Sequence, residues 1–200
     1  RFEEDALRIL RGLRFASKLG FAIEPETAAA MRRQVHRLHC IAAERIREEL
    51  TGLLCGRYVQ RTLMTYADLI TSALPELAPM QGCQQQNPHH LYDVWEHTVR
   101  AVGQVPAEPV LRWAMLLHDS GKPACKTVDE QGIGHFRGHP KVSREIAERV
   151  VARLRFSTED TERILLLVER HDTPLGDNEK LVRRSLSRIG VPRPAGDQKG

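Results

Sequence analysis

Apolar residues recur at intervals of three to four along nearly the whole chain, and this spacing constrains the fold more than any other sequence feature. In the first segment Leu7, Leu10 and Ala16 follow it up to Leu19, and Gly20 stands where a left-handed helix cap would lie. Prolines and glycines divide the rest of the pattern into further segments. The sequence predicts helices over about 3–19, 25–38, 42–54, 58–73, 89–103, 109–120, 139–155, 158–171 and 178–189.

One short stretch departs from the helical pattern. Thr127-Val128 and the run from Ile133 to Phe136 flank Asp129-Glu130-Gln131-Gly132, a sequence suited to a turn. A short β-hairpin is therefore expected at about 126–136. The predicted fold class is all-α, with this hairpin as its only β-structure.

The segment from Pro79 to Pro88 is the best candidate for a domain boundary. It reads PMQGCQQQNP, with two prolines, a glycine and a run of three glutamines. The sequence thus predicts a helical domain over 1–80, a second helical domain over 86–190, and a flexible tail over 191–200 that is rich in proline and glycine.

The charge balance permits an RNA partner without requiring one. The chain has 30 basic and 26 acidic residues, a net charge of +4 and a pI near 9.0. Between positions 31 and 61, seven arginines face only Glu44, Glu48 and Glu49, so a basic surface there could follow phosphates. The alternative is a set of solvated helix faces with pairs such as Arg45 and Glu49.

Compartment and redox state follow from two further features. No apolar run approaches the roughly 18 to 20 residues of a membrane span, and the first residues do not resemble a signal peptide. The four cysteines are widely spaced, with no C-x-x-C pair, which predicts neither a disulfide framework nor a thiolate zinc site. We expect a cytoplasmic protein with reduced thiols and no membrane partner.

Two His-Asp dipeptides, His118-Asp119 and His171-Asp172, each close an apolar predicted helix. An imidazole and a carboxylate at the end of such a run need partners, because burying them unpaired costs free energy. A divalent metal is one such partner, and nitrogen and oxygen donors without thiolate suit Mn, Fe, Co, Ni, Zn or, with more oxygens, Mg. A single histidine is more often a hydrogen-bonded core or surface residue.

The ordered set weakens that simpler interpretation. The sequence presents His97, then His118-Asp119 followed by Gly121-Lys122, then Gly138-His139, then His171. This order resembles the HD superfamily of metal-dependent phosphohydrolases over about half of the chain. The resemblance implies that His97, His118 and Asp119 hold one metal ion, and that His139 and His171 extend the cluster towards a second.

Asp119 is the natural bridging carboxylate and the catalytic centre of such a cluster. Lys122 lies one turn beyond His118 and could neutralise substrate phosphate oxygens, or simply complement a helix C-terminus. The HD superfamily usually closes its cluster with an aspartate on a later helix, where this chain offers only Asp197 in the tail. Asp172 is the substitute that we nominate as a metal ligand.

The first predicted helix carries a second chemical candidate. Asp5 and Arg8 are three positions apart and share one helix face, where a surface ion pair is the simpler interpretation. A carboxylate that accepts from an exocyclic amine, beside a guanidinium that donates to the ring, also matches the base edges of cytosine and adenine. Guanine and uracil present a carbonyl there instead.

Several longer segments, RFEEDALRILRGLRFASKLGFAIEPETAAAM, AAERIREELTGLL, PELAPM and NPHHLYDVWEHT, occur in the order found in one family. They resemble the bacterial tRNA nucleotidyltransferases that add CCA ends, of the poly(A) polymerase-related class, over nearly the whole chain. The resemblance implies a neck over 1–80 in which Asp5 and Arg8 read the base of CTP or ATP, with Arg11 supporting the base or triphosphate. It also implies tRNA as a partner and an HD domain from about 86.

The family's catalytic head contributes a G-S-x-x-D-x-D metal site, and this chain has no such sequence. Nucleotidyl transfer depends on metals and positioned charges. We therefore expect a piece of a longer enzyme that cannot polymerise nucleotides by itself.

Three functional hypotheses remain open on the sequence. The first is the neck and HD portion of a CCA-adding enzyme, whose HD domain hydrolyses phosphomonoesters or 2′,3′-cyclic phosphates. The second is a tRNA-docking module with a silent or structural metal site. The third is a free-standing HD nucleotide phosphohydrolase whose first 80 residues serve packing only.

Overall fold

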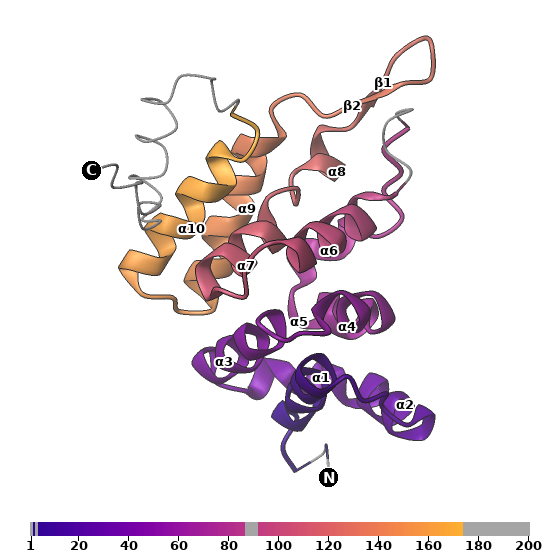
Figure 1. Ribbon diagram of the computed structural model, residues 1–200, viewed down its shortest axis with the longest axis vertical. Helices are drawn as coiled ribbons and strands as arrows, with labels where there is room; N and C mark the ends of the chain where they lie inside the picture. The colour runs from indigo at the N-terminus through magenta and orange to yellow at the C-terminus, as the bar shows by residue number, and fades with distance from the viewer. Residues whose placement is uncertain (1, 3, 87–91, 174–200) are drawn as a thin grey trace, which may run out of the picture.

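The computed structural model describes residues 2, 4–86 and 92–173. Within this part α1 to α5 form one half of the molecule and α6 to α10 the other (Figure 1). The α-helices are α1 Leu7–Leu19, α2 Pro25–Gln34, α3 Ala43–Leu54, α4 Val59–Thr65, α5 Ala67–Ala73, α6 Val94–Gln104, α7 Pro109–Leu117, α8 Lys122–Cys125, α9 His139–Arg153 and α10 Thr158–Arg170. Two 3-10 helices, η1 Val35–Cys40 and η2 Pro75–Met80, complete the helical elements.

The all-α prediction is confirmed, and the hairpin lies where the sequence placed it. Strand β1, Thr127–Val128, pairs antiparallel with β2, Gly134–His135. The Asp129 carboxylate organises the turn, since Oδ1 accepts from the backbone N–H groups of Gln131 and Ile133, at 3.0 and 2.9 Å. Its Oδ2 lies 2.7 Å from His135 Nε2. The hydrogen bond from His135 and those from the backbone hold the pKa of Asp129 below its usual range.

The first helix begins later than expected and ends where predicted. Asp5 Oδ1 accepts from the Leu7 N–H at 3.0 Å, so the helix begins at Leu7. It ends at Gly20, whose φ of 76° is the left-handed conformation that favours glycine. A Cβ at Gly20 would stand 2.8 Å from the Tyr58 ring, so this glycine also lets α4 approach α1.

Three further predicted helices differ in extent from the observed ones. The segment 58–73 forms two helices because the chain departs from helical geometry at Tyr66, whose hydroxyl accepts from the Ile23 N–H at 3.1 Å. The second helix gives way to η1 at Val35. The helix expected to reach residue 120 ends at Leu117, where a turn begins that carries the first His-Asp dipeptide.

The glutamine-rich segment is packed against its surroundings in its described part. Gln85 is 1% exposed and donates through Nε2 to the Tyr92 carbonyl at 3.0 Å, and the Gln86 carbonyl accepts from the Gly134 N–H at 2.8 Å. The division at 80 to 86 stays a prediction. The predicted helix 178–189, the tail 191–200 and Asp197 lie outside the described residues, as do the first residues of the expected helix 89–103.

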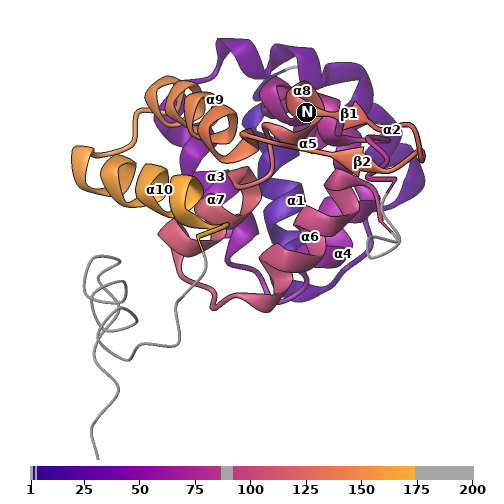
Figure 2. The same ribbon diagram turned by 90° about the horizontal axis from the view of Figure 1, so that it is seen from above.

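One hydrophobic core runs through both halves. Leu13 and Leu53 come from α1 and α3, and Trp113 and Val150 from α7 and α9. Helices α9 and α10 lie side by side and cover α7 (Figure 2). This packing brings the ends of α7, α9 and α10 together near one face of the molecule. None of the described helices combines the length and apolar character of a bilayer-spanning helix, and all four cysteines are free thiols.

Candidate metal centre

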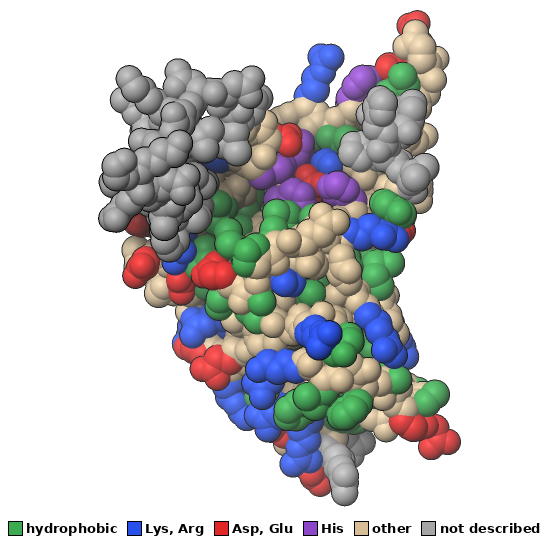
Figure 3. All heavy atoms as spheres, in the orientation of Figure 1, with side chains coloured by type: hydrophobic (Ala, Val, Ile, Leu, Met, Phe, Trp, Pro, Cys, Tyr) green, Lys and Arg blue, Asp and Glu red, His purple; other side chains and the backbone are tan. Residues whose placement is uncertain are grey.

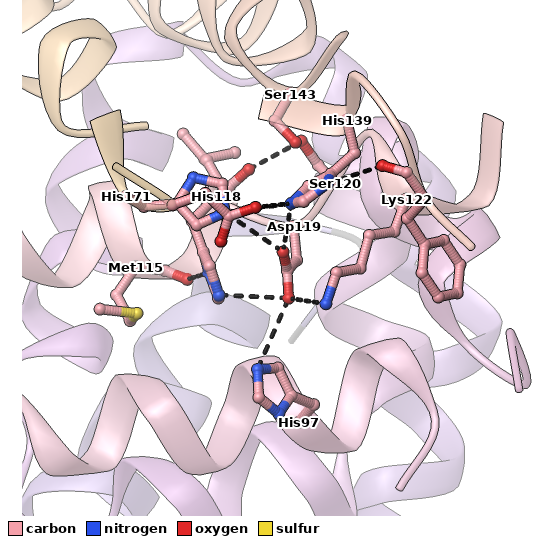
Figure 4. Close-up of polar contacts among 12 residues, drawn as sticks. His97, Met115, His118, Asp119, Ser120, Lys122, His139, Ser143 and His171 are labelled. Carbon is pink, nitrogen blue, oxygen red and sulfur yellow. Dashed lines mark hydrogen bonds and ion pairs between the residues drawn. The ribbon is translucent and has the colours of Figure 1, made fainter. Parts of the chain in front are cut away.

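Asp119 lies at the centre of a cluster of imidazoles and is 1% exposed. His97 comes from the first half of α6, and His118 from the turn after α7. His139 opens α9, and His171 follows the last residue of α10. Figure 4 shows these side chains converging on the carboxylate from separate elements. The structure thus brings together residues that are up to 74 positions apart in the chain.

One oxygen of Asp119, Oδ2, faces three nitrogen atoms. It lies 3.2 Å from His118 Nε2, 2.9 Å from Lys122 Nζ and 3.6 Å from His97 Nε2. This oxygen is shielded from solvent, and no donor among the described residues reaches it with hydrogen-bond geometry. Such a buried oxygen needs a positive charge close to it, and the Lys122 ammonium supplies one.

The other oxygen, Oδ1, faces the second pair of histidines. It lies 3.2 Å from His139 Nε2 and 3.5 Å from His171 Nε2, and these two nitrogens are 3.1 Å apart. Asp172 stands at the rim with 60% of its side chain exposed, and its carboxylate oxygens lie 3.4 Å from His139 Nε2 and 3.5 Å from His171 Nε2. Asp172 is therefore near the cluster, on its solvent side.

Three of the imidazoles are held in the same way. The Nδ1 of each ring lies within hydrogen-bond distance of the carbonyl three residues earlier: His118 with Met115 at 2.7 Å, His139 with Phe136 at 2.9 Å, and His171 with Val168 at 2.7 Å. A carbonyl accepts only, so Nδ1 carries the proton. In the neutral ring this leaves a lone pair on each Nε2, directed at Asp119.

This arrangement fits a cation. Lone pairs on the Nε2 atoms of His139 and His171, 3.1 Å apart, repel each other and the carboxylate unless a positive charge lies among them. The donor atoms of His97, His118 and Asp119 lie within 4.8 Å of one another, as do those of Asp119, His139 and His171. Neutral imidazole with a second hydrogen bond at Nδ1, together with carboxylate, is a common donor set for divalent metals.

The titration behaviour of the cluster reflects these contacts. Burial raises the pKa of Asp119, but the imidazoles of His118, His139 and His171 lower it more, so this pKa lies well below the usual carboxyl range. Burial lowers the pKa of His171, but Asp119, the Val168 carbonyl and Asp172 raise it more, so the net shift is upward. Both directions show that the cluster favours positive charge around the carboxylate.

Lys122 is buried within the same cluster. Its Nζ lies 2.9 Å from Asp119 Oδ2, donates to Gln85 Oε1 at 3.1 Å and stands 5.5 Å from the centre of the Phe136 ring. The sequence predicts Lys122 at this site but not Gln85, because Gln85 lies in a glutamine run that is also typical of a loop. The residues around Gln85 in the sequence give no signal that its side chain is buried.

Two small residues, Gly121 and Ser143, let the start of α8 approach α9, and neither is among the candidate site residues predicted from the sequence. A Cβ at Gly121 would stand 2.6 Å from the backbone nitrogen of Ser143 and 2.7 Å from the His139 carbonyl, so glycine is required for this contact. The buried Ser143 Oγ accepts from the Gly121 N–H at 2.9 Å. The available sequence signal for this contact was the position of Gly121, two residues after the His118-Asp119 dipeptide.

The candidate nucleotide-binding residues lie far from this cluster, on α1 and just before it. Arg8 pairs with Glu4 at 2.9 Å, and the Asp5 carboxylate lies 3.6 Å from Arg45 Nη2. Arg11 Nε donates to the buried Glu49 carboxylate at 3.1 Å. The contacts of Asp5 and Arg11 join this segment to α3, whereas the Arg8–Glu4 pair is local. The base-reading role of Asp5, Arg8 and Arg11 stays a prediction.

The arginines of 31–61 are partly engaged within the molecule. Arg32 pairs with Asp68, and Arg47 donates to the Arg155 carbonyl. The expected pairing of Arg45 with Glu49 is replaced by longer-range contacts, since Arg45 lies near Asp5 and Glu49 near Arg11. Tertiary packing of α1 on α3 thus overrides the pairs expected from spacing.

Known proteins match both halves of the chain. The family model described as "HD domain" matches residues 89–188, and that described as "Probable RNA and SrmB- binding site of polymerase A" matches 20–81. The chain is 37% identical to the A-adding tRNA nucleotidyltransferase of Deinococcus radiodurans over 197 residues, and 39% identical to the CC-adding tRNA nucleotidyltransferase of Thermus thermophilus over 199. It is 33% identical to the multifunctional CCA protein of an Azoarcus species over 180 residues.

The extent of these matches defines what the chain corresponds to. The first two alignments cover 92% of this chain and 45% of the relative, and the third covers 85% and 43%. The chain thus spans less than half the length of these relatives. Through residues 89–188 the chain belongs to the HD-domain family, and over 92% of its length it is similar to A-adding and CC-adding tRNA nucleotidyltransferases, with an RNA-binding neck region before the HD domain.

Proposed function

We propose that this chain forms part of an enzyme that matures the 3′ end of tRNA, and that its HD domain is a metal-dependent phosphohydrolase. The observation that carries the second statement is the convergence of three imidazoles, each anchored through Nδ1, on one buried carboxylate. Packing alone does not require four imidazoles around a buried aspartate. Phosphomonoesters and 2′,3′-cyclic phosphates are the proposed substrates.

The proposed division of labour follows the two oxygens of Asp119. His97, His118 and Oδ2 would hold one divalent ion, and His139, His171 and Oδ1 a second, with Asp172 as a further ligand at the rim. Such ions acidify water and stabilise charge on a leaving oxygen. Asp119 orients both halves of the site, while the Nδ1 hydrogen bonds fix the rings so that their Nε2 atoms stay directed inward.

The neck carries the proposed link to tRNA. Its relatives are named as A-adding and CC-adding tRNA nucleotidyltransferases, and an RNA-binding family model matches 20–81. On this basis residues 1–80 form the neck and 86–190 the HD domain. In the whole enzyme Asp5 and Arg8 would read the base of CTP or ATP, with Arg11 beside them. A tRNA partner places the proposed activity in the cytoplasm.

The HD activity is tested with protein purified without chelators. We expect hydrolysis of a generic phosphodiester, a phosphomonoester or a 2′,3′-cyclic nucleotide in the presence of Ni, Mn or Mg. His118→Ala should reduce the rate at least about 100-fold, since even the loss of a group that only orients a metal ligand costs about 10- to 100-fold. His135→Ala is the matched control, because His135 pairs with Asp129 in the hairpin and lies outside the cluster.

Two results would contradict the proposal. Equal rates for the wild type and His118→Ala would remove the cluster from the mechanism. No hydrolysis by the wild type with any of these metals would favour a tRNA-docking module with a silent site.

A second prediction concerns Lys122, whose ammonium group we propose meets the phosphate oxygens of the substrate. Lys122→Met should raise KM about 10- to 100-fold, the equivalent of one hydrogen bond to a charged group, and should leave the metal content unchanged. Lys141→Met on the exposed side of α9 is the control. Loss of metal with an unchanged KM would show that Lys122 acts only through Asp119.

A further inference from the structure

The Lys122 ammonium group lies between two acceptors of different kinds. Its Nζ is 2.9 Å from Asp119 Oδ2, an ion pair without hydrogen-bond geometry, and it donates to Gln85 Oε1 at 3.1 Å. A charge attraction alone sets no direction, whereas a hydrogen bond weakens steeply when its angle is poor. Among the described residues, Gln85 is therefore the group that fixes the direction of the Lys122 N–H bonds.

The amide of Gln85 has the donor and the acceptor that this position requires. Its Nε2 donates to the Tyr92 carbonyl at 3.0 Å, while its Oε1 accepts from Lys122 Nζ. A carbonyl only accepts and an ammonium only donates, so both partners demand the same orientation of the amide. A carboxylate at this position would offer acceptors only. Glutamine thus joins Tyr92 to Lys122 in one defined arrangement.

The segment that carries Gln85 is itself held by the hairpin. Gln85 is 1% exposed, and a Cβ at Gly134 would collide with its backbone carbonyl, so the glycine in β2 lets the hairpin approach this closely. The Gly134 N–H also donates to the Gln86 carbonyl at 2.8 Å. This segment lies between η2 and α6, so the chain between the two halves of the molecule reaches the cluster through the Gln85 side chain.

The cluster is open to solvent on one side, although Lys122 itself is only 8% exposed. Figure 3 shows His side chains gathered on one face of the molecule, with acidic and basic side chains among them. An ammonium group has three N–H donors, and Gln85 takes one of them. A phosphate that enters from this face can therefore accept from a donor that Gln85 does not use.

We propose that Gln85 is a positioning residue of the HD site, which orients the Lys122 ammonium towards a phosphate group of the substrate. The inference rests on the proposed function, which makes Lys122 the contact for phosphate oxygens, and it adds the residue that orients this contact. A side chain whose direction is set before binding loses less conformational entropy when its ligand arrives. Gln85 thus strengthens phosphate binding without touching the phosphate.

The test measures binding of inorganic phosphate to the whole chain, in the presence of Mg, by isothermal titration calorimetry. Gln85→Met keeps the length of the side chain and removes the amide, so the Kd should rise about 2- to 10-fold, the range for one ordinary hydrogen bond. In hydrolysis KM should rise by a similar factor, with kcat and metal content unchanged. Gln84→Met is the matched control, because Gln84 is the exposed neighbour in the same glutamine run; it should bind phosphate as the wild type does.

A double variant separates positioning from a purely structural role. If Gln85 acts only through Lys122, adding Gln85→Met to Lys122→Met should change the Kd by less than about twofold. If Gln85 merely supports the fold, the two losses multiply, and this result would overturn the inference. Gln85→Asn shortens the side chain by one methylene, so its amide cannot reach both partners. It should repeat the loss, and it takes the place of Gln85→Met if that variant does not fold.

Failure of the inference and failure of the proposed function give different results. Equal phosphate affinity in the wild type and the Gln85 variants, including no binding by any of them, would overturn the inference, while hydrolysis by the wild type would leave the proposed function standing. Phosphate binding that weakens in Gln85→Met, together with no hydrolysis by the wild type, would refute the phosphohydrolase and support Gln85 as a positioning residue of a phosphate-binding site.

Discussion

Asp119→Asn is expected to abolish metal retention and phosphoester hydrolysis together. The carboxylate faces all four imidazoles and supplies the only negative charge that is buried within the described cluster. An amide keeps the shape and removes the charge, so the affinity for a divalent metal should fall at least about 100-fold, beyond what the loss of an outer partner costs. Calorimetric titration with Mn or Ni measures this directly.

The same substitution should destabilise the metal-free protein. It leaves the buried Lys122 ammonium, 2.9 Å from the carboxylate in the wild type, without its counter-charge. Breaking a buried ion pair by removing one partner costs about 3–5 kcal/mol. Because the pKa of Asp119 is lowered, its contribution to stability is present above the ordinary carboxyl pKa and is lost only as the pH falls through the lowered value.

Asp129→Asn is the control, because it makes the same chemical change at a carboxylate in the hairpin. It should leave metal affinity and hydrolysis unchanged. Metal affinity that is equal in the wild type and in Asp119→Asn would refute the proposed ligand role of Asp119.

Trp113→Ala is expected to produce the largest loss of stability among single substitutions in the core. Trp113 is fully buried on α7, donates through Nε1 to Thr51 Oγ1 at 2.9 Å, and meets the Phe156 ring edge-on at 5.3 Å between centroids. It joins the neck to the HD half. Truncation of a buried tryptophan costs about 3–5 kcal/mol of unfolding free energy, which lowers Tm by about 6–20 °C in a chain of this size.

Thermal unfolding followed by circular dichroism measures the effect. Phe21→Ala is the matched control, because this ring is 69% exposed and its loss should change the unfolding free energy by less than about 0.5 kcal/mol. A Tm shift for Trp113→Ala as small as that of the control would show that the junction does not depend on this side chain. Two separate transitions in the variant would show that the halves can unfold independently.

Much of the fold was predictable because the helices are amphipathic and their ends carry strong local signals. Gly20 and Pro109 stand at helix ends that the sequence predicted. The break at Tyr66 was not predictable from local spacing, and the Tyr66 hydroxyl accepts from the Ile23 N–H, 43 positions away. The same holds for Glu49, which is buried under Arg11 and Arg14 from another helix.

The sequence indicated which residues gather at the candidate site, but not which contacts they make there. The dipeptides His118-Asp119 and His171-Asp172 stood out because polar pairs closed apolar helices. The anchoring of each ring on the carbonyl three residues earlier depends on how each helix begins or ends, and the contact of Lys122 with Gln85 depends on the path of the intervening chain. Neither is encoded in local spacing.

The metal content of the protein tests the central claim most directly. Protein purified without chelators, incubated with Mn, Ni or Mg and desalted, should retain about one to two divalent ions per chain by mass spectrometry, as a two-metal cluster requires. His135→Ala should retain the same amount, and Asp119→Asn should retain almost none. A wild-type protein that holds no more metal than Asp119→Asn would contradict the account.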